Sequence, residues 1–236
     1  MPSLIDMASG IFSRESRALE TAAQNIANLS TPGYKRAVHF STFLGPGSVN
    51  SARQPATPVG ANATDFSPGK LVPSSSATHL AISGSGFFQL QTDAGPAYTR
   101  SGSFQIDERG RLISPQGWPV QAAGGGDVVI QDPNWKLAPD GTVLESGRPT
   151  ARILLVDFQD KHGLQRTLGG LFQSDARPVE IDMPVIRQGY LESSNVSSAT
   201  DMVQLMETIR RAETAQKLVH AYDDMLGRAL RQPGEA

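Results

Sequence analysis

The sequence predicts an α+β fold. Long N- and C-terminal helices of the coiled-coil type flank an antiparallel all-β domain, and an extended linker arm follows the first helix. Three observations predict this fold. Apolar residues recur at alternating steps of three and four near both chain ends, apolar and polar residues alternate in the middle, and a Pro- and Gly-rich segment lies between. We expect four regions: an N-terminal helix in residues 1–34, the arm in 35–75, the β domain in 76–190 and a C-terminal helix in 191–236.

The first helix is predicted over residues 4–29. Ser3 and Asp6 form a capping pattern at its start, and Thr31-Pro32-Gly33 ends it, because Pro lacks an amide hydrogen and disfavours helical dihedrals in the residue before it. At about 1.5 Å per residue the helix is roughly 40 Å long. With Glu15 counted as its one polar member, a heptad seam runs along it. The apolar members of this seam are Ile5, Ala8, Phe12, Leu19, Ala22, Ile26 and Leu29.

The arm has the composition of a linker. Residues 42–78 contain five prolines among Gly, Ser, Ala and Thr, with only three charged side chains. Such a stretch cannot bury enough apolar surface to fold by itself. Two interpretations remain open: a disordered linker, or an extended arm that becomes ordered on a neighbouring molecule.

The middle of the chain is predicted to form short strands that are separated by sequence motifs typical of turns. The turns include Asp107-Glu108-Arg109-Gly110 and the hairpin signal Asp140-Gly141. Because no helical pattern separates the strands, we expect an antiparallel barrel or sandwich over residues 76–190. The strand-like segments are 88–91, 97–100, 103–106, 111–113, 127–130, 142–144 and 152–158.

The C-terminal helix begins at a second capping pattern, Ser198 with Asp201, and is roughly 48 Å long. Gln216 interrupts its seam. Two arrangements remain open: the two helices pair within one molecule, or both pack with copies from neighbouring subunits into a tube. We favour the tube and expect the seams to be the assembly interface. The C-terminal seam consists of Met202, Leu205, Ile209 and Ala212, then Val219, Tyr222, Leu226 and Ala229.

Composition narrows the classes of function. A net charge of −2 argues against a nucleic-acid or anionic-lipid surface, which needs clustered Lys and Arg. The absence of cysteine removes disulfides, thiolate metal sites and cysteine nucleophiles. Asp6, Arg14 and Glu15 interrupt the N-terminal apolar pattern, so we expect no cleaved signal peptide, and apolar runs are too short to span a membrane.

No motif predicts a catalytic, cofactor-binding or metal site. The glycines at 84 and 86 precede a strand, whereas phosphate-binding loops open a helix, so we interpret them as a tight turn. The four histidines are far apart and lack metal-ligand spacing. We therefore expect neither an enzyme nor a small-molecule binder.

Three stretches identify a family resemblance. The runs AQNIANLSTPGYK at 23–35, ISGSGFF at 82–88 with YTRSGSF at 98–104 and DERGRL at 107–112, and GYLESSNV at 189–196 resemble signatures of bacterial flagellar rod and hook proteins. The residues that carry the resemblance are Asn25, Asn28, Thr31, Gly33, Tyr34, Gly84, Gly86, Phe87, Phe88, Tyr98, Gly102, Gly189 and Asn195.

The resemblance implies a structural subunit of the flagellar basal-body rod, exported by the flagellar type III apparatus and assembled with itself and other rod and axial proteins. The terminal helices would form an inner tube, the β domain would lie outside it, and the arm would bridge subunits in the periplasm. The length fits a proximal rod subunit, with a distal rod or hook-type subunit as the alternative. From other classes, a peptidoglycan hydrolase carrying rod elements and a secreted adhesin or binding module remain as alternatives.

Overall fold

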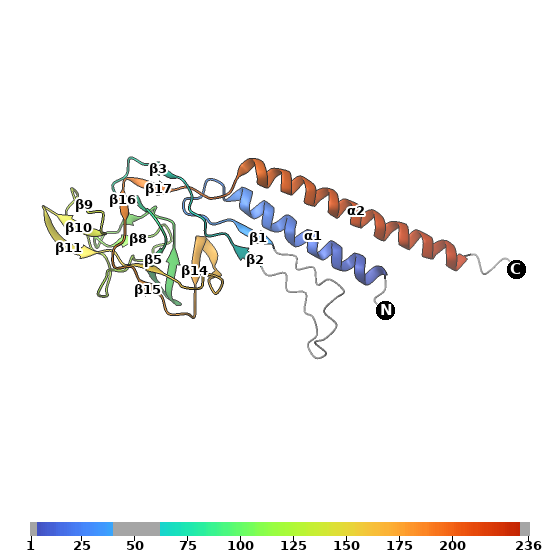
Figure 1. The fold of residues 1–236 in the computed structure, drawn as a ribbon, viewed down its shortest axis with the longest axis horizontal. Coiled ribbons are helices and arrows are strands. Elements are labelled where there is room, and N and C mark those ends of the chain that lie inside the picture. Colours follow the sequence, from blue (N-terminus) through green and yellow to red (C-terminus); the bar gives the residue numbers. More distant parts are fainter. Residues whose placement is uncertain (1–3, 40–61, 232–236) are drawn as a thin grey trace. The chain divides into compact units, whose positions relative to one another are not determined.

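The computed structural model describes residues 4–39 and 62–231 (Figure 1). These residues divide into two compact units, which we call the helix unit and the β unit. The helix unit contains residues 4–27, 37–39, 62–64 and 197–231, and the β unit contains Asn28–Arg36 and Asp65–Val196. No helix in the described part of the chain has the length and apolar character needed to cross a membrane.

Two helices that pack against each other form most of the helix unit (Figure 1). They are α1 (Leu4–Ala27) and α2 (Ser198–Arg231). The predicted cap of α2 was one residue late: the carboxylate of Asp201 accepts a hydrogen bond from the amide of Ser197 at 3.1 Å, so Ser197 is the capping residue. The predicted end of α1 was two residues late, because the chain turns after Ala27 and the Thr31 amide donates to the Asn28 carbonyl at 3.1 Å.

A short ladder completes the helix unit. Strands β1 (Ala37–His39) and β2 (Asn62–Thr64) pair antiparallel. The predicted arm, residues 35–75, therefore contains paired strands among its described residues. Residues 40–61 lie outside the described residues, so the choice between a linker and an ordered arm stays a prediction.

The β unit is built on an open antiparallel sheet of six strands. At its centre the hairpin β5–β6 pairs in register from Phe88↔Thr99 to Thr92↔Gly95. The sheet order is β13 (Gln165–Arg166), β14 (Leu171–Gln173), β6 (Gly95–Thr99), β5 (Phe87–Thr92), β12 (Leu155–Asp157) and β15 (Val179–Glu180).

Alternation along these strands fills two apolar clusters. Phe87 and Val156 belong to one cluster, and Phe88 and Leu155 belong to the other, as expected when successive side chains point to opposite faces of a sheet. The larger cluster also contains Phe104, whose ring packs edge-on against Phe88 with centroids 5.0 Å apart. Both faces of the central hairpin are therefore buried.

Four smaller antiparallel sheets also belong to the β unit. Their pairs are β16 (Ile186–Gln188) with β4 (Leu80–Ile82), β17 (Tyr190–Glu192) with β3 (Leu71–Pro73), β7 (Gln105–Ile106) with β8 (Leu112–Ile113), and β10 (Thr142–Glu145) with β9 (Lys136–Leu137) and β11 (Arg148–Arg152). A short 3₁₀ turn, η1, covers Leu168–Gly170.

The predicted antiparallel domain between two terminal helices is confirmed. The six-stranded sheet has free ends at β13 and β15, so it is not a closed barrel. The strand predicted at 127–130 was wrong: this segment makes only isolated bridges, Arg111↔Val129 and Gln121↔Asp127. Its backbone hydrogen bonds are divided between two neighbours, since the Leu112 amide donates to the Val128 carbonyl and the Val128 amide donates to the Val120 carbonyl.

Candidate assembly interface and buried junction

The buried side chains of the helix unit are small or polar. On α2 they are spaced seven residues apart, so they lie on one face of the helix. This buried stripe is one position away from the predicted seam residues Met202 and Ile209, which are exposed. Sequence reasoning missed the stripe because counting apolar residues ignores Asp and Thr. The buried residues are Thr21, Ala22, Asn25 and Ala37, followed on α2 by Asp201, Thr208 and Ala215.

The predicted seam residues divide into several groups. Ala22 is buried, whereas Leu19, Ile26, Leu205 and Ala212 are half-buried. The side chains of Ile5, Ala8, Val219, Tyr222, Leu226 and Ala229 lie outside the described residues. Four predicted seam residues are exposed: Phe12, Leu29, Met202 and Ile209. Three further apolar residues of α2, which were not predicted in the seam, are exposed as well: Val203, Met206 and Met225.

Asn25 fixes β1 to α1 through its side-chain amide. Its Nδ2 donates to the carbonyl of Ala37 at 2.8 Å, and its Oδ1 accepts from the amide of Ala37 at 2.9 Å. The side chain thus pairs with a backbone as a neighbouring strand would. A buried backbone amide and carbonyl need such partners, which explains why an Asn occupies this position near the end of α1.

A second cluster, the junction, lies in the β unit and consists of residues 33–36, 65–70 and 192–195 with Arg100. At its centre the Glu192 carboxylate accepts from Lys35 Nζ at 2.6 Å and from Arg100 Nε at 2.9 Å. The side chains of Lys35 and Glu192 are each only 1% exposed. The Gly69 amide also donates to Glu192, at 2.8 Å.

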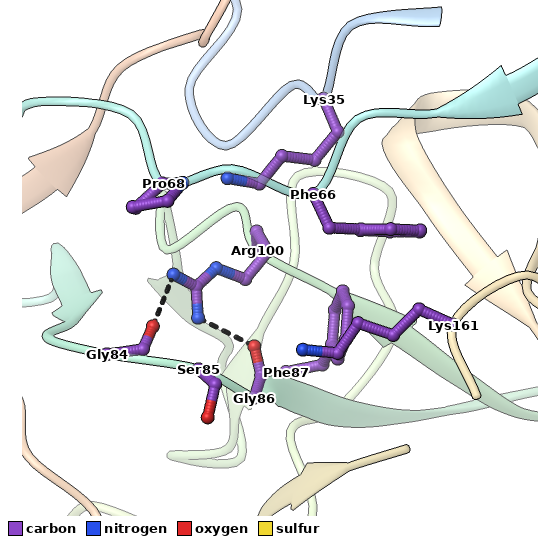
Figure 2. A pocket seen from close by; sticks show the side chains of 9 residues that line it. All are labelled: Lys35, Phe66, Pro68, Gly84, Ser85, Gly86, Phe87, Arg100 and Lys161. Atoms are coloured by element: carbon purple, nitrogen blue, oxygen red, sulfur yellow. Dashed lines mark hydrogen bonds between the residues drawn. The ribbon is translucent and has the colours of Figure 1, made fainter. Parts of the chain in front are cut away.

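The other donors of the two cations are bonded to backbone carbonyls. Lys35 Nζ donates to the Ser67 carbonyl at 2.8 Å. Arg100 donates to the carbonyls of Gly86 at 2.7 Å and Gly84 at 2.8 Å, the two dashed lines in Figure 2. Burial lowers the pKa of Lys35, although its hydrogen bond and charge interaction with Glu192 act in the opposite direction. The paired carboxylate is therefore what keeps a buried ammonium tolerable.

The side-chain amide of Asn195 binds backbone groups of the junction, as the side-chain amide of Asn25 binds those of β1. The Oδ1 of Asn195 accepts from the Arg36 amide at 2.6 Å, and its Nδ2 donates to the Asp65 carbonyl at 2.8 Å. The Gly33 amide donates to the Glu192 carbonyl at 2.7 Å. Segments 33–36, 65–70 and 192–195 are thus bonded to one another, although they are far apart in the sequence.

Close backbone approaches account for two of the signature glycines. At Gly33, which has φ +69°, an added Cβ would lie 2.3 Å from the Ser101 nitrogen. At Gly102 it would lie 1.5 Å from the Leu80 carbonyl oxygen. No side chain fits at either position, so both glycines are structural.

The remaining signature residues also have structural surroundings. Thr31 Oγ1 donates to Asn28 Oδ1 at 3.2 Å in the turn after α1, and Gly189 has φ +74° between two strands. The ring of Tyr34 lies 4.6 Å from the Arg166 guanidinium carbon, a cation–π contact. Phe87, Phe88 and Tyr98 belong to the two apolar clusters of the β unit.

A cavity of about 290 Å³ opens beside the junction (Figure 2). Its polar side chains already have partners inside the protein: Lys161 pairs with Asp157 at 3.1 Å, and Ser85 also hydrogen-bonds to Asp157. The lining residues are Lys35, Phe66, Pro68, Gly84, Ser85, Gly86, Phe87, Arg100 and Lys161. Among the described residues, no group of acidic or histidine side chains could hold a metal ion.

Three family models match the chain. The model described as "Flagella basal body rod protein" matches residues 5–35, "Flagellar hook protein FlgE/F/G D1 domain" matches 81–146, and "Flagellar basal body rod FlgEFG protein C-terminal" matches 187–232. The first and third cover most of the two helices, and the second covers the central hairpin of the β unit.

Whole-chain relatives agree with these matches. The flagellar basal-body rod protein FlgG of Buchnera aphidicola subsp. Acyrthosiphon pisum is 30% identical, over 96% of this chain and 97% of the relative. Rod protein FlgF is 29% identical in Escherichia coli, over 97% of both chains, and 29% identical in Rhizobium meliloti, over 92% of both. FlgF and FlgG relatives are thus equally similar, and the chain belongs to the flagellar basal-body rod protein family.

Proposed function

We propose that the chain is a structural subunit of the flagellar rod that assembles through the two helices of its helix unit. One observation carries the proposal: among the described helix residues, the fully buried ones are small or polar, and bulky apolar ones such as Met202 and Met206 are exposed. Apolar side chains that gather on one surface mark a site of protein–protein contact. A neighbouring helix would remove this surface from water.

The exposed face of α2 has the spacing of a helix-packing stripe. Met202, Met206 and Ile209 are 51%, 60% and 38% exposed, and their steps of four and three place them on one face. Full burial of such a side chain contributes about 1.5–3 kcal/mol. Because each subunit repeats the contact, the stabilisation grows with the length of the assembly.

A rod built in this way would transmit torque from the motor to the hook and filament. Long helices packed along an axis resist twisting, because shear between neighbours must break many side-chain contacts together. We propose that residues 1–34 and 191–236 form the axial core, that 76–190 lie outside it, and that 35–75 bridge subunits. In this arrangement the seam residues in both helices, such as Ile5 and Leu226, are the assembly interface.

Within the rod, we place the subunit in the proximal part, with a distal rod or hook-type position as the alternative. The FlgF of Escherichia coli aligns over 97% of both chains, which is consistent with this position, and the FlgG of Buchnera aphidicola, which aligns over 97% of its length, keeps the alternative open. Its neighbours would be other rod and axial proteins and further copies of itself. We propose export through the flagellar type III apparatus without a cleaved signal, to a rod that crosses the periplasm. The relatives are named as rod proteins, which supports a structural role over a hydrolytic one.

The test is the substitution Ile209→Asp in the natural bacterium. A charge on the exposed face should block assembly, because a partner helix would have to bury it. We expect loss of rods from isolated basal bodies and loss of swimming, while the purified variant keeps the circular dichroism and thermal unfolding of the natural protein. Thr214→Asp, at an exposed position of α2 outside the seam, is the matched control and should swim normally.

Normal rods and swimming in the Ile209→Asp strain would contradict the proposed interface. Loss of swimming with intact rods would place the defect outside assembly and would also contradict it.

A further inference from the structure

The junction holds together three segments that lie far apart in the sequence. Lys35 and Glu192 are 157 positions apart, and Gly69 and Glu192 are 123 positions apart. Glu192 contacts all the parts: its carboxylate bonds Lys35, Arg100 and the Gly69 amide, and its carbonyl accepts from the Gly33 amide. Glu192, the last residue of β17, thus connects the segment before β1 to Arg100, which follows β6 of the six-stranded sheet.

The two cations at the junction differ in how strongly the rest of the β unit holds them. Arg100 has two further bonds, to the carbonyls of Gly84 and Gly86 (Figure 2). The Nζ of Lys35 has one, to the carbonyl of Ser67, and the Lys35 carbonyl accepts a hydrogen bond from Arg166. The charge of Arg100 also acts against the protonated form of Lys35. Without the carboxylate, the two positive charges would face each other in a buried site, and the more weakly held Lys35 would leave first.

We propose that Glu192 is a positioning residue that makes the docking of residues 33–36 conditional on the docking of residues 192–195. Loss of the Glu192 carboxylate loosens the N-terminal segment, which then keeps its bonds through Gly33, Arg36 and the Lys35 carbonyl, whereas the central hairpin does not depend on the carboxylate. The segments that lead into β1 and into α2 therefore become ordered together. This inference concerns the free subunit and does not rest on the proposed assembly.

The test is hydrogen–deuterium exchange of the full-length protein with the substitution Glu192→Gln. Gln keeps the shape but removes the charge that both cations need. We expect amide exchange at residues 33–36 and 65–70 to become at least about tenfold faster, while β5 and β6 exchange at the natural rate. Glu180→Gln is the matched control, because its ion pair with Arg152, 2.9 Å long, has side chains 45% and 43% exposed. It should leave all four segments unchanged.

A second substitution tests the order of dependence. Lys35→Met leaves the bond between Arg100 and Glu192 in place, so exchange should accelerate at 33–36 but stay natural at Glu192 and Ser193, whose backbones pair with residues 70–71, and in β5 and β6. Equal acceleration everywhere in either variant would show simple loss of stability and overturn the proposal. Unchanged exchange at 33–36 in Glu192→Gln would also overturn it. If Glu192→Gln does not fold, Lys35→Met alone decides, by whether its acceleration is confined to 33–36.

Discussion

The two units of the chain bury different kinds of side chain. In the β unit, Phe88, Phe104 and Phe172 are almost completely buried, and two apolar clusters cover both faces of the central hairpin. Among the described residues of the helix unit, the buried positions hold residues such as Thr21 and Ala215, and larger apolar side chains are half-buried, as at Leu205, or exposed, as at Met206. The β unit thus has an apolar core of its own, whereas the helix unit keeps much of its apolar surface on the outside.

This difference in buried side chains indicates that the two units are stabilised in different ways. Burial of apolar area is the main favourable term in folding, so the β unit has the material to fold without a partner. Isolated helices are only marginally stable in water, and helices in proteins owe most of their stability to tertiary packing. Contacts with neighbouring molecules would therefore stabilise the helix unit more than the β unit. Substitutions in each unit test this difference.

The largest effect is expected from Phe88→Ala, which removes a fully buried ring from β5. Truncation of a buried Phe costs about 3–5 kcal/mol, because the lost contacts leave a cavity. Thermal and denaturant unfolding of the purified protein measure the change. Met206→Ala, on the exposed face of α2, is the control and should shift the free energy of unfolding by less than about 0.5 kcal/mol. Similar losses in the two variants would refute the contrast between the units.

A smaller effect is expected from Asn25→Ala. The substitution leaves the amide and the carbonyl of Ala37 without their side-chain partner, which costs about 1–3 kcal/mol when such groups are buried. Hydrogen exchange should accelerate at β1 and at the end of α1, but not in β5 and β6. Glu213→Ala, at an exposed position of α2, is the control. Natural exchange at β1 in the Asn25 variant would show that packing alone holds the strand.

The smallest effect concerns acid stability of the β unit through Asp157. Burial acts to raise the pKa of this carboxyl, but hydrogen bonds from the Phe158 amide, Lys161 and Ser85 outweigh burial and lower it. The folded protein therefore favours the carboxylate. This contribution is complete above the ordinary pKa of 3.8 and is lost as the pH falls through the lower folded value.

Asp157→Asn should accordingly flatten the dependence of stability on pH between about pH 5 and pH 2, by less than about 1 kcal/mol for a partly exposed pair. Denaturant unfolding across this pH range measures the effect, with the exposed Asp175→Asn as the control. An unchanged slope in the Asp157 variant would mean that the carboxylate does not contribute.

Local patterns predicted the elements well. The alternating steps of three and four predicted both helices, because helical periodicity is a pattern among neighbouring residues. The predicted end of α1 was within two residues of the observed one, and the predicted start of α2 was within one. The alternation of apolar and polar residues predicted strands at 88–91 and 97–100, which form the central hairpin, for the same reason. The strand predicted at 127–130 was wrong, because an apolar run does not reveal that its backbone hydrogen bonds are divided between two neighbouring segments.

The sequence by itself determined the order of the elements, the family signatures and the apolar character of the two helix seams. Only the tertiary structure decided that α2 buries Asp201 and Thr208 while Met202 is exposed, since the choice of face depends on what packs there. It alone also joined Lys35 to Glu192. Residues 157 positions apart share no local pattern, and a buried ion pair forms only where the fold excludes water from both charges.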